Sequence, residues 1–244
     1  MYELHYWPGI QGRGEFVRLA LEYAGVDYID VARADESHDG GEEALMKRMQ
    51  GADLQHPPFA PPWLKVGDQL IGQTANILLF LGRRHGLAPK EEAGELWTHQ
   101  LQLTIADFIV EIHDVHHPIG SGLYYEDQRD EARRRARDFR DNRVPKFLKY
   151  FATVLQRNPA GDLHLVGSKV TYADLSLFQV IAGLRYAFPN LMRSTAKQYR
   201  QVMTLHDRTA AEPRLASYFA SARRIAFNQE GIFRHYPELD SAAT

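Results

Sequence analysis

The chain has 244 residues, and its 29 lysines and arginines nearly balance its 31 aspartates and glutamates, so no nucleic-acid partner is indicated. It contains no cysteine, which excludes disulfides, thiolate metal sites and a cysteine nucleophile. Because no apolar run approaches the roughly 20 residues that span a bilayer, and residues 1–9 carry no export signal, we expect a cytoplasmic protein with no membrane partner.

The first 83 residues predict a mixed α/β domain. An alternating, aromatic stretch at residues 2–7 predicts a strand, and helical spacing over residues 16–24 ends at Gly25, where a C-terminal glycine belongs. Residues 28–31 form a second short strand. A strand, helix and strand of this length imply a parallel pair with a right-handed crossover.

The stretch Phe59–Gly82 predicts a hairpin followed by a helix. Pro61-Pro62 stands before the first strand, and a strand that opens on proline lies at an edge or follows a sharp turn. Gln73-Thr74 begins the helix, where unpaired N–H groups and the helix dipole favour a carboxylate or phosphate. The alternative is that Thr74 only caps its own helix.

Residues 84–93 have the composition of a linker, and residues 94–244 have helical periodicity almost throughout. Apolar residues step by three or four from Trp97 to Val115, which predicts one long helix. A second helical stretch, Tyr124–Gln156, contains Pro145 as a bend. Thr171-Tyr172-Ala173-Asp174 has the pattern of a capping box.

The order of these features resembles a glutathione transferase over essentially the whole chain. The resemblance depends on Tyr6 after the first strand, Arg13 at a helix start, Pro62-x-Leu64, Gln73-Thr74 and the sequence LVGSKVTYADLSLF (165–178). It implies an α/β plus all-α fold: a thioredoxin-like βαβ-ββα domain at residues 1–83 that binds glutathione, and an all-helical domain at residues 94–244 that lines the electrophile pocket. It also implies a homodimer.

The opening YELHYWPGIQGRGEFVR is similar to the tyrosine-type classes, in which a tyrosine after the first strand activates the glutathione thiol. The resemblance therefore implies that Tyr6 is catalytic: a phenol O–H aimed at the sulfur stabilises the thiolate and lowers its pKa. A buried tyrosine that only needs a hydrogen-bond partner is the alternative.

The resemblance also implies a set of residues that bind glutathione, the cosubstrate: Trp7, Arg13, Lys47, Pro61, Gln73, Thr74 and, from the other subunit, Asp107. Three of them have a simpler interpretation: aromatic packing for Trp7, a surface ion pair for Arg13 and exposure to solvent for Asp107. Pro61 departs from the family pattern, because the residue before the cis-proline there pairs with glutathione through both N–H and C=O, and proline has no N–H.

His113 and His117 are spaced i, i+4, which suits metal ligation on a helix. No HExxH motif or third ligand is identifiable, so we expect no metal and assign both histidines to the electrophile pocket. Residues 233–237 either fold over the site or seal the base of the helical domain.

We therefore expect a glutathione transferase that conjugates glutathione to a small hydrophobic electrophile. A noncatalytic ligand-binding or interaction protein of the same fold, and a glutathione-dependent peroxidase or isomerase, remain alternatives.

Overall fold

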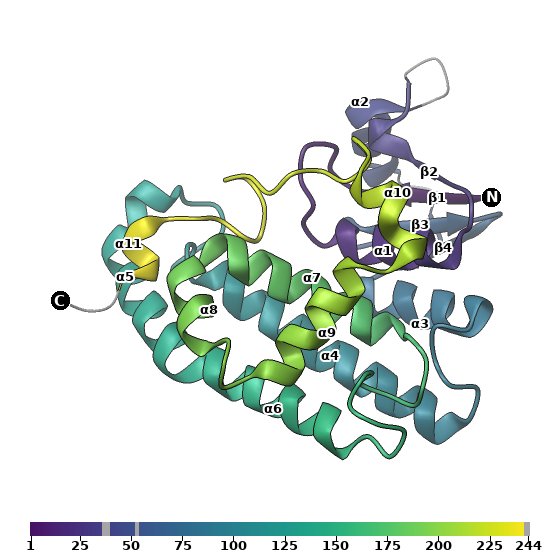
Figure 1. Ribbon diagram of the computed structural model, residues 1–244. Helices are drawn as coiled ribbons and strands as arrows, with labels where there is room; N and C mark the ends of the chain where they lie inside the picture. The colour runs from purple at the N-terminus through teal and green to yellow at the C-terminus, as the bar shows by residue number, and fades with distance from the viewer. Residues whose placement is uncertain (36–39, 52–53, 242–244) are drawn as a thin grey trace.

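Figure 1 shows the computed structural model, which describes residues 1–35, 40–51 and 54–241. A small sheet with its helices forms the N-terminal part, and a helical bundle forms the rest. The elements of the N-terminal part are β1 (Tyr2–His5), α1 (Gly14–Ala24), β2 (Tyr28–Asp30), α2 (Gly41–Met49), β3 (Trp63–Val66), β4 (Gln69–Gly72) and α3 (Thr74–His85).

The four strands form one mixed sheet in the order β2-β1-β3-β4. Strand β1 pairs in parallel with β2 and antiparallel with β3, and the turn at Gly67 returns the chain from β3 into antiparallel β4. Gly25 ends α1 with a positive φ of 65°, which glycine adopts without steric cost. The sheet confirms the predicted βαβ-ββα order.

The two faces of the sheet carry different side chains. Leu4 and Leu64, which are paired across β1 and β3, are buried in the main core with apolar residues of α1 and α3. On the opposite face the paired residues His5 and Trp63 stack their rings 4.9 Å apart. Trp63 packs there with Leu45 of α2 in a separate small cluster. Successive residues of a strand point to opposite faces, so Tyr6 continues on the side of Leu4.

The remaining helices form the C-terminal part, which confirms an all-helical domain. They are α4 (Glu92–Asp114), α5 (Arg129–Asp138), α6 (Val144–Arg157), α7 (Tyr172–Ala187), α8 (Pro189–Thr195), α9 (Arg200–Ala210), α10 (Ala216–Phe219) and α11 (Pro237–Asp240). Helix α7 is buried at the centre and contacts α4, α9 and α1, as Figure 1 shows. Among the described helices, none combines the length and the apolar character needed to cross a membrane.

The predicted bend in the second helical stretch is a change of helix type. Helix α5 ends at Asp138, a π-helical turn covers Phe139–Arg143, and α6 starts at Val144. Pro145 therefore lies in the first turn of α6, directly after the π-helical turn.

Helix α7 begins with the predicted capping box. The carboxylate of Asp174 accepts hydrogen bonds from the backbone N–H of Thr171 at 2.8 Å and from its hydroxyl at 2.6 Å. Its other oxygen accepts from the N–H of Leu165 at 2.8 Å. Asp174 is completely buried, so this one side chain fixes both the start of α7 and the loop before it.

The segment after α10 runs back between the two parts of the chain, where it lies beside the loop that precedes α1 (Figure 1). Asn228 donates to the carbonyl oxygen of Gly9 at 2.8 Å, and the side chain of Gln11 donates to the carbonyl oxygen of Ile225. Phe233 is buried against Gly183 of α7. The segment thus seals the helical domain and also touches the N-terminal loop.

Candidate functional site

A cavity of about 270 Å³ lies between the start of α3, the residue before α1 and the middle of α4. Three residues predicted to bind glutathione line it together: Arg13, Gln73 and Thr74. Helix α4 supplies the facing wall, with His99, Gln102, Leu103, Ala106 and Ile109. The volume is below the roughly 300–1,000 Å³ of pockets that bury drug-sized ligands, so it suits one end of an extended ligand.

The start of α3 lines this cavity and has no side-chain cap. Gln73 has a φ of 66°, and among the described residues every other positive φ belongs to glycine. No side chain caps the helix, and the hydroxyl oxygen of Thr74 is buried without a hydrogen-bond partner. The expected alternative, in which Thr74 caps its own helix, therefore has no supporting hydrogen bond. An uncapped N-terminus at a cavity favours a carboxylate.

Arg13 connects the cavity to Tyr6. Its side chain lines the cavity and forms no ion pair with any other described residue. Its backbone N–H donates to the hydroxyl oxygen of Tyr6 at 2.8 Å. The guanidinium group is thus a positive charge available to an anion, and it belongs to the same residue whose backbone N–H binds the predicted catalytic phenol.

Tyr6 does not itself line the cavity. Its side chain is only 5% exposed, and its ring lies beneath the backbone of Gly12 and Gly14. A methyl group at Gly12 would lie 2.0 Å from the hydroxyl oxygen of Tyr6, and one at Gly14 would lie 2.5 Å from its ring. Only glycine at these two positions allows the loop to cover the ring so closely.

Burial raises the pKa of Tyr6, and the hydrogen bond from Arg13 and the charges of Arg13 and Arg18 offset only part of this effect. The phenol therefore stays protonated at neutral pH. Because its oxygen already accepts from Arg13, its own O–H remains as a donor. This arrangement suits a group that donates a hydrogen bond to an anion and does not suit a general base.

The structure does not bring every predicted site residue into this cavity. Trp7 packs with the cluster around Trp63, on the opposite face of the sheet. Lys47 is exposed and lines a separate cavity of about 580 Å³ with Arg48 and Lys65. Pro61 is half-buried, and its bond to Pro62 is cis. Their roles in binding glutathione stay predictions.

Helix α4 forms one wall of the cavity without Asp107, whose expected contact is with glutathione bound to the other subunit and stays a prediction. Asp107 is exposed and is not a lining residue, whereas Gln102, which the sequence did not single out, lines the cavity and is completely buried. Gln102, Ala106 and Ile109 follow each other at helical spacing, and His113 continues the same face.

His113 belongs to a compact group with His116 and His117. The rings of His113 and His117 stack with centroids 5.1 Å apart, and the Nδ1 atoms of His116 and His117 are 2.5 Å apart. His116 also donates to the carbonyl oxygen of Ile232 at 2.8 Å. Helix α4 ends at Asp114, so His117 lies beyond it and the expected i, i+4 helical pair does not form.

Burial lowers the pKa of all three histidines, to about 3 for His116 and about 4 for His117. The charge of Arg234 lowers each of them further, and the charge of Arg13 acts on His113. The three rings are therefore neutral at neutral pH. No metal-binding group of three or more suitable side chains occurs in the part of the chain that the structure describes.

A buried polar network holds the loop that carries Arg13. Glu15 is completely buried and accepts hydrogen bonds from the hydroxyl of Tyr218, at 2.6 Å, and from Arg224. The amide of Gln179 on α7 donates to Gln11 at 2.6 Å. The start of α1 is thus fixed by side chains of the helical domain.

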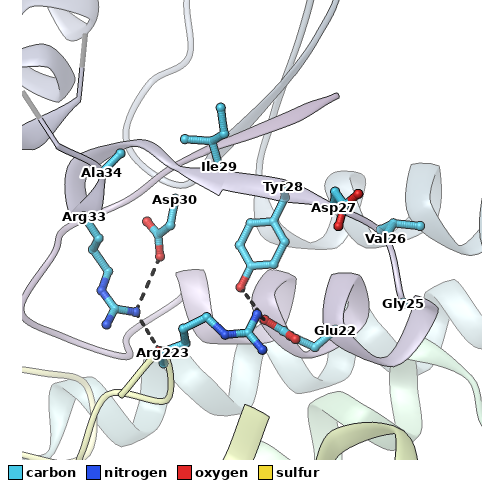
Figure 2. Close-up of a pocket in the computed structure, with 10 residues that line it drawn as sticks. All are labelled: Glu22, Gly25, Val26, Asp27, Tyr28, Ile29, Asp30, Arg33, Ala34 and Arg223. Carbon is cyan, nitrogen blue, oxygen red and sulfur yellow. Dashed lines mark hydrogen bonds and ion pairs between the residues drawn. The ribbon is translucent and has the colours of Figure 1, made fainter. Parts of the chain in front are cut away.

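A larger hollow, of about 630 Å³, lies along the edge strand β2 and is shown in Figure 2. Most of its polar side chains are already paired with one another through hydrogen bonds and ion pairs. Tyr28 donates a hydrogen bond to Glu22 at 2.9 Å, and Arg223 forms an ion pair with Glu22. Arg33 pairs with Asp30 and donates to the carbonyl oxygen of Arg223. None of the predicted site residues lies here, so the smaller cavity is the better candidate.

Comparison with known proteins agrees with this fold. Residues 113–222 match a family model described as "Glutathione S-transferase, C-terminal domain". The chain is 24% identical to glutathione S-transferase P 1 of Xenopus laevis, over 91% of this chain and 93% of that protein. It is 26% identical to hematopoietic prostaglandin D synthase of Gallus gallus, over 92% and 98%. The solved structure of a prostaglandin synthase D of Nilaparvata lugens superposes with a TM-score of 0.71 at 19% identity, covering 91% of this chain and 98% of that one.

Proposed function

Because this chain belongs to the cytosolic glutathione transferase superfamily, we propose that it binds glutathione in the cavity at the start of α3 and conjugates it, through its sulfur, to a small hydrophobic electrophile. The observation that carries the proposal is that Arg13 lines this cavity and at the same time donates its backbone N–H to Tyr6. The cavity would hold the γ-glutamyl end of glutathione, and Tyr6 would act on its thiol.

The proposed reaction needs no redox partner. The glutathione thiol loses its proton to water, and the thiolate attacks the electrophilic carbon. A sulfur–carbon bond forms, and the leaving group departs with its electron pair. Tyr6 donates its O–H to the sulfur, and this hydrogen bond stabilises the thiolate. The backbone N–H of Arg13 donates to the same phenol oxygen and keeps it in position. The raised pKa of Tyr6 supports this role, because only the protonated phenol can donate.

Two features support binding of the γ-glutamyl carboxylate, the start of α3 and Arg13. Residues 73–76 at the start of α3 line the cavity, no side chain caps this helix, and Gln73 has a positive φ. Arg13 adds a positive charge. Anions at such helix starts gain from both the hydrogen bonds and the dipole.

The neutral face of His113 and His117 is proposed as a wall for an apolar electrophile.

One observation favours a noncatalytic ligand-binding protein as the second candidate. The hydroxyl of Tyr6 is covered by Gly12 and does not reach the cavity surface. The sulfur of bound glutathione contacts this phenol only if the covering loop shifts. Two similar proteins are named as prostaglandin D synthases, so isomerisation by the same thiolate is an alternative use of an active Tyr6.

Tyr6→Phe separates these candidates. In a transferase, the pKa of the bound glutathione thiol rises, and conjugation to an activated aryl halide falls by about 10- to 100-fold, which corresponds to one hydrogen bond to a charged group. Thiolate absorbance across a pH titration measures the first effect. Glutathione affinity stays near that of the wild type, because Tyr6 does not line the γ-glutamyl cavity.

A thiol pKa that is unchanged by Tyr6→Phe would contradict the catalytic role. Unchanged binding without measurable thiolate in the wild type would identify the noncatalytic protein instead. We also propose a cytoplasmic homodimer, as the resemblance implies, which sedimentation analysis and fractionation of expressing cells test.

A further inference from the structure

The backbone N–H of Arg13 that binds Tyr6 belongs to a turn at the start of α1. Gln11 comes two residues before Arg13, and Glu15 comes two residues after it. The N–H of Glu15 donates to the carbonyl oxygen of Gln11 at 2.9 Å, which closes the turn. Both flanking side chains are buried. Groups that hold these two side chains therefore also fix the direction of the Arg13 N–H.

Four side chains form a chain of hydrogen bonds that closes through this turn into a ring. The guanidinium group of Arg224 donates to Glu15 through one nitrogen and to Oε1 of Gln179 through another, the latter at 2.9 Å. The Nε2 of Gln179 donates to Oε1 of Gln11 at 2.6 Å. Gln11 in turn donates to the carbonyl oxygen of Ile225, the residue after Arg224. The ring thus connects the turn, α7 and the segment that follows α10.

Arg224 supplies the charge that this ring depends on. Glu15 is completely buried, and a buried carboxylate that loses its cation is strongly unfavourable. Arg18 is a second cation beside Glu15, at 3.5 Å, but its Nε is bonded to Asp30 at 2.7 Å. Glu15 therefore depends mainly on Arg224, which lies more than 200 residues further along the chain.

We propose that Arg224 is a positioning residue: by holding Glu15 and Gln179, it keeps the backbone N–H of Arg13 on the phenol oxygen of Tyr6 and so stabilises the thiolate of bound glutathione. A phenol oxygen that accepts a hydrogen bond donates more strongly through its own O–H, because successive hydrogen bonds polarise one another. Among the described residues that line the glutathione cavity, none of the four ring residues occurs, so Arg224 acts through Tyr6. This inference rests on the proposed role of Tyr6.

The test compares Arg224→Met with Arg223→Met, the same substitution one residue earlier. Arg223 is exposed and pairs with Glu22, outside the ring. Thiolate absorbance of bound glutathione, titrated with pH, should give a thiol pKa that is raised by about 0.5–1 unit in Arg224→Met and unchanged in Arg223→Met. At a pH below these values, kcat for an activated aryl halide falls by about 3- to 10-fold. The KM for glutathione changes less, since the ring does not line the cavity.

The same substitution in a Tyr6→Phe background shows whether Arg224 acts through the phenol. Without the phenol oxygen, Arg13 has nothing to hold there, so Arg224→Met should raise the thiol pKa no further. A further rise as large as the one in the wild-type background overturns the inference, because the effect then does not pass through Tyr6.

Gln179→Met opens the ring at α7 and leaves the ion pair between Arg224 and Glu15 in place. Methionine has nearly the shape of glutamine, and this variant should raise the thiol pKa in the same direction. Thermal unfolding shows which variants fold. An unchanged thiol pKa in folded Arg224→Met overturns the inference while the proposed function stands. If Arg224→Met does not fold, an unchanged thiol pKa in Gln179→Met overturns it instead.

The proposed function fails separately from this inference. A thiol pKa that Tyr6→Phe itself leaves unchanged refutes the role of Tyr6, and the role of Arg224 with it. A thiol pKa that rises in Tyr6→Phe but not in Arg224→Met refutes only the role of Arg224.

Discussion

Replacing Gly12 by alanine tests how the loop before α1 holds Tyr6. Gly12 has a φ of 43°, in the left-handed region where an alanine costs about 1–2 kcal/mol. The new methyl group would lie 2.0 Å from the hydroxyl oxygen of Tyr6, so the phenol must move and its 2.8 Å hydrogen bond with Arg13 is lost. Leaving these buried groups unpaired costs a further ~1–3 kcal/mol.

Together these effects lower the free energy of unfolding by about 3 kcal/mol, which in a chain of this length lowers the melting temperature by roughly 6–12 °C. Guanidinium unfolding followed by circular dichroism measures the loss. Gly9→Ala is the matched control, because Gly9 lies in the same loop with no positive φ and no atom within 4 Å of the added methyl group.

A double-mutant cycle identifies the contact responsible. Tyr6→Phe removes the atom closest to the methyl group, so the double variant Gly12→Ala/Tyr6→Phe should be more stable than the two separate losses predict. The reasoning is refuted if Gly12→Ala and Gly9→Ala have the same stability within about 0.5 kcal/mol. Strict additivity in the cycle would show that the overlap with Tyr6 contributes nothing.

Two further predictions concern stability. The pKa of His116, lowered to about 3 in the folded protein, is below its unfolded value of about 6.5. The unfolded state therefore binds the proton first, and the free energy of unfolding falls by up to about 1.4 kcal/mol per pH unit as the pH falls from 6.5 toward 3. His116→Gln should flatten this dependence in urea unfolding measured between pH 7 and pH 5, and an unchanged slope would exclude this histidine as its source. Asp174→Ala should lower the free energy of unfolding by about 3–5 kcal/mol, because the buried N–H groups of Thr171 and Leu165 both lose their acceptor. A loss below about 1 kcal/mol in denaturant titration would show that water or another group replaces the carboxylate.

Local patterns were sufficient to predict much of the fold. Gly25 at the end of α1 and the Thr171–Asp174 capping box each depend on residues within one or two turns, so their geometry follows from neighbouring residue types. The position of Gln73 and Thr74 at the start of a helix also follows from the local pattern, and this helix start lines a cavity.

The parts that the sequence did not predict depend on contacts between distant segments. Gln102 stands next to the apolar stripe of α4, and the helix pattern alone does not show that its amide is buried without a partner. The covering of Tyr6 by Gly12 depends on the exact path of the loop. The placing of Lys47 and Gln73 in two different cavities likewise depends on how distant segments pack, and the role of Lys47 stays a prediction.

The hydrogen bonds from Gln11 to Ile225 and from Asn228 to Gly9 have a consequence for synthesis of the protein. More than 200 residues separate these partners along the chain. A nascent chain emerges from the ribosome N-terminus first, so the sheet and α1 can form while the loop over Tyr6 still lacks its final contacts. That loop can form these contacts only after residues 225–228 have been translated, so in a partly made chain the loop over Tyr6 lacks contacts that the finished protein has.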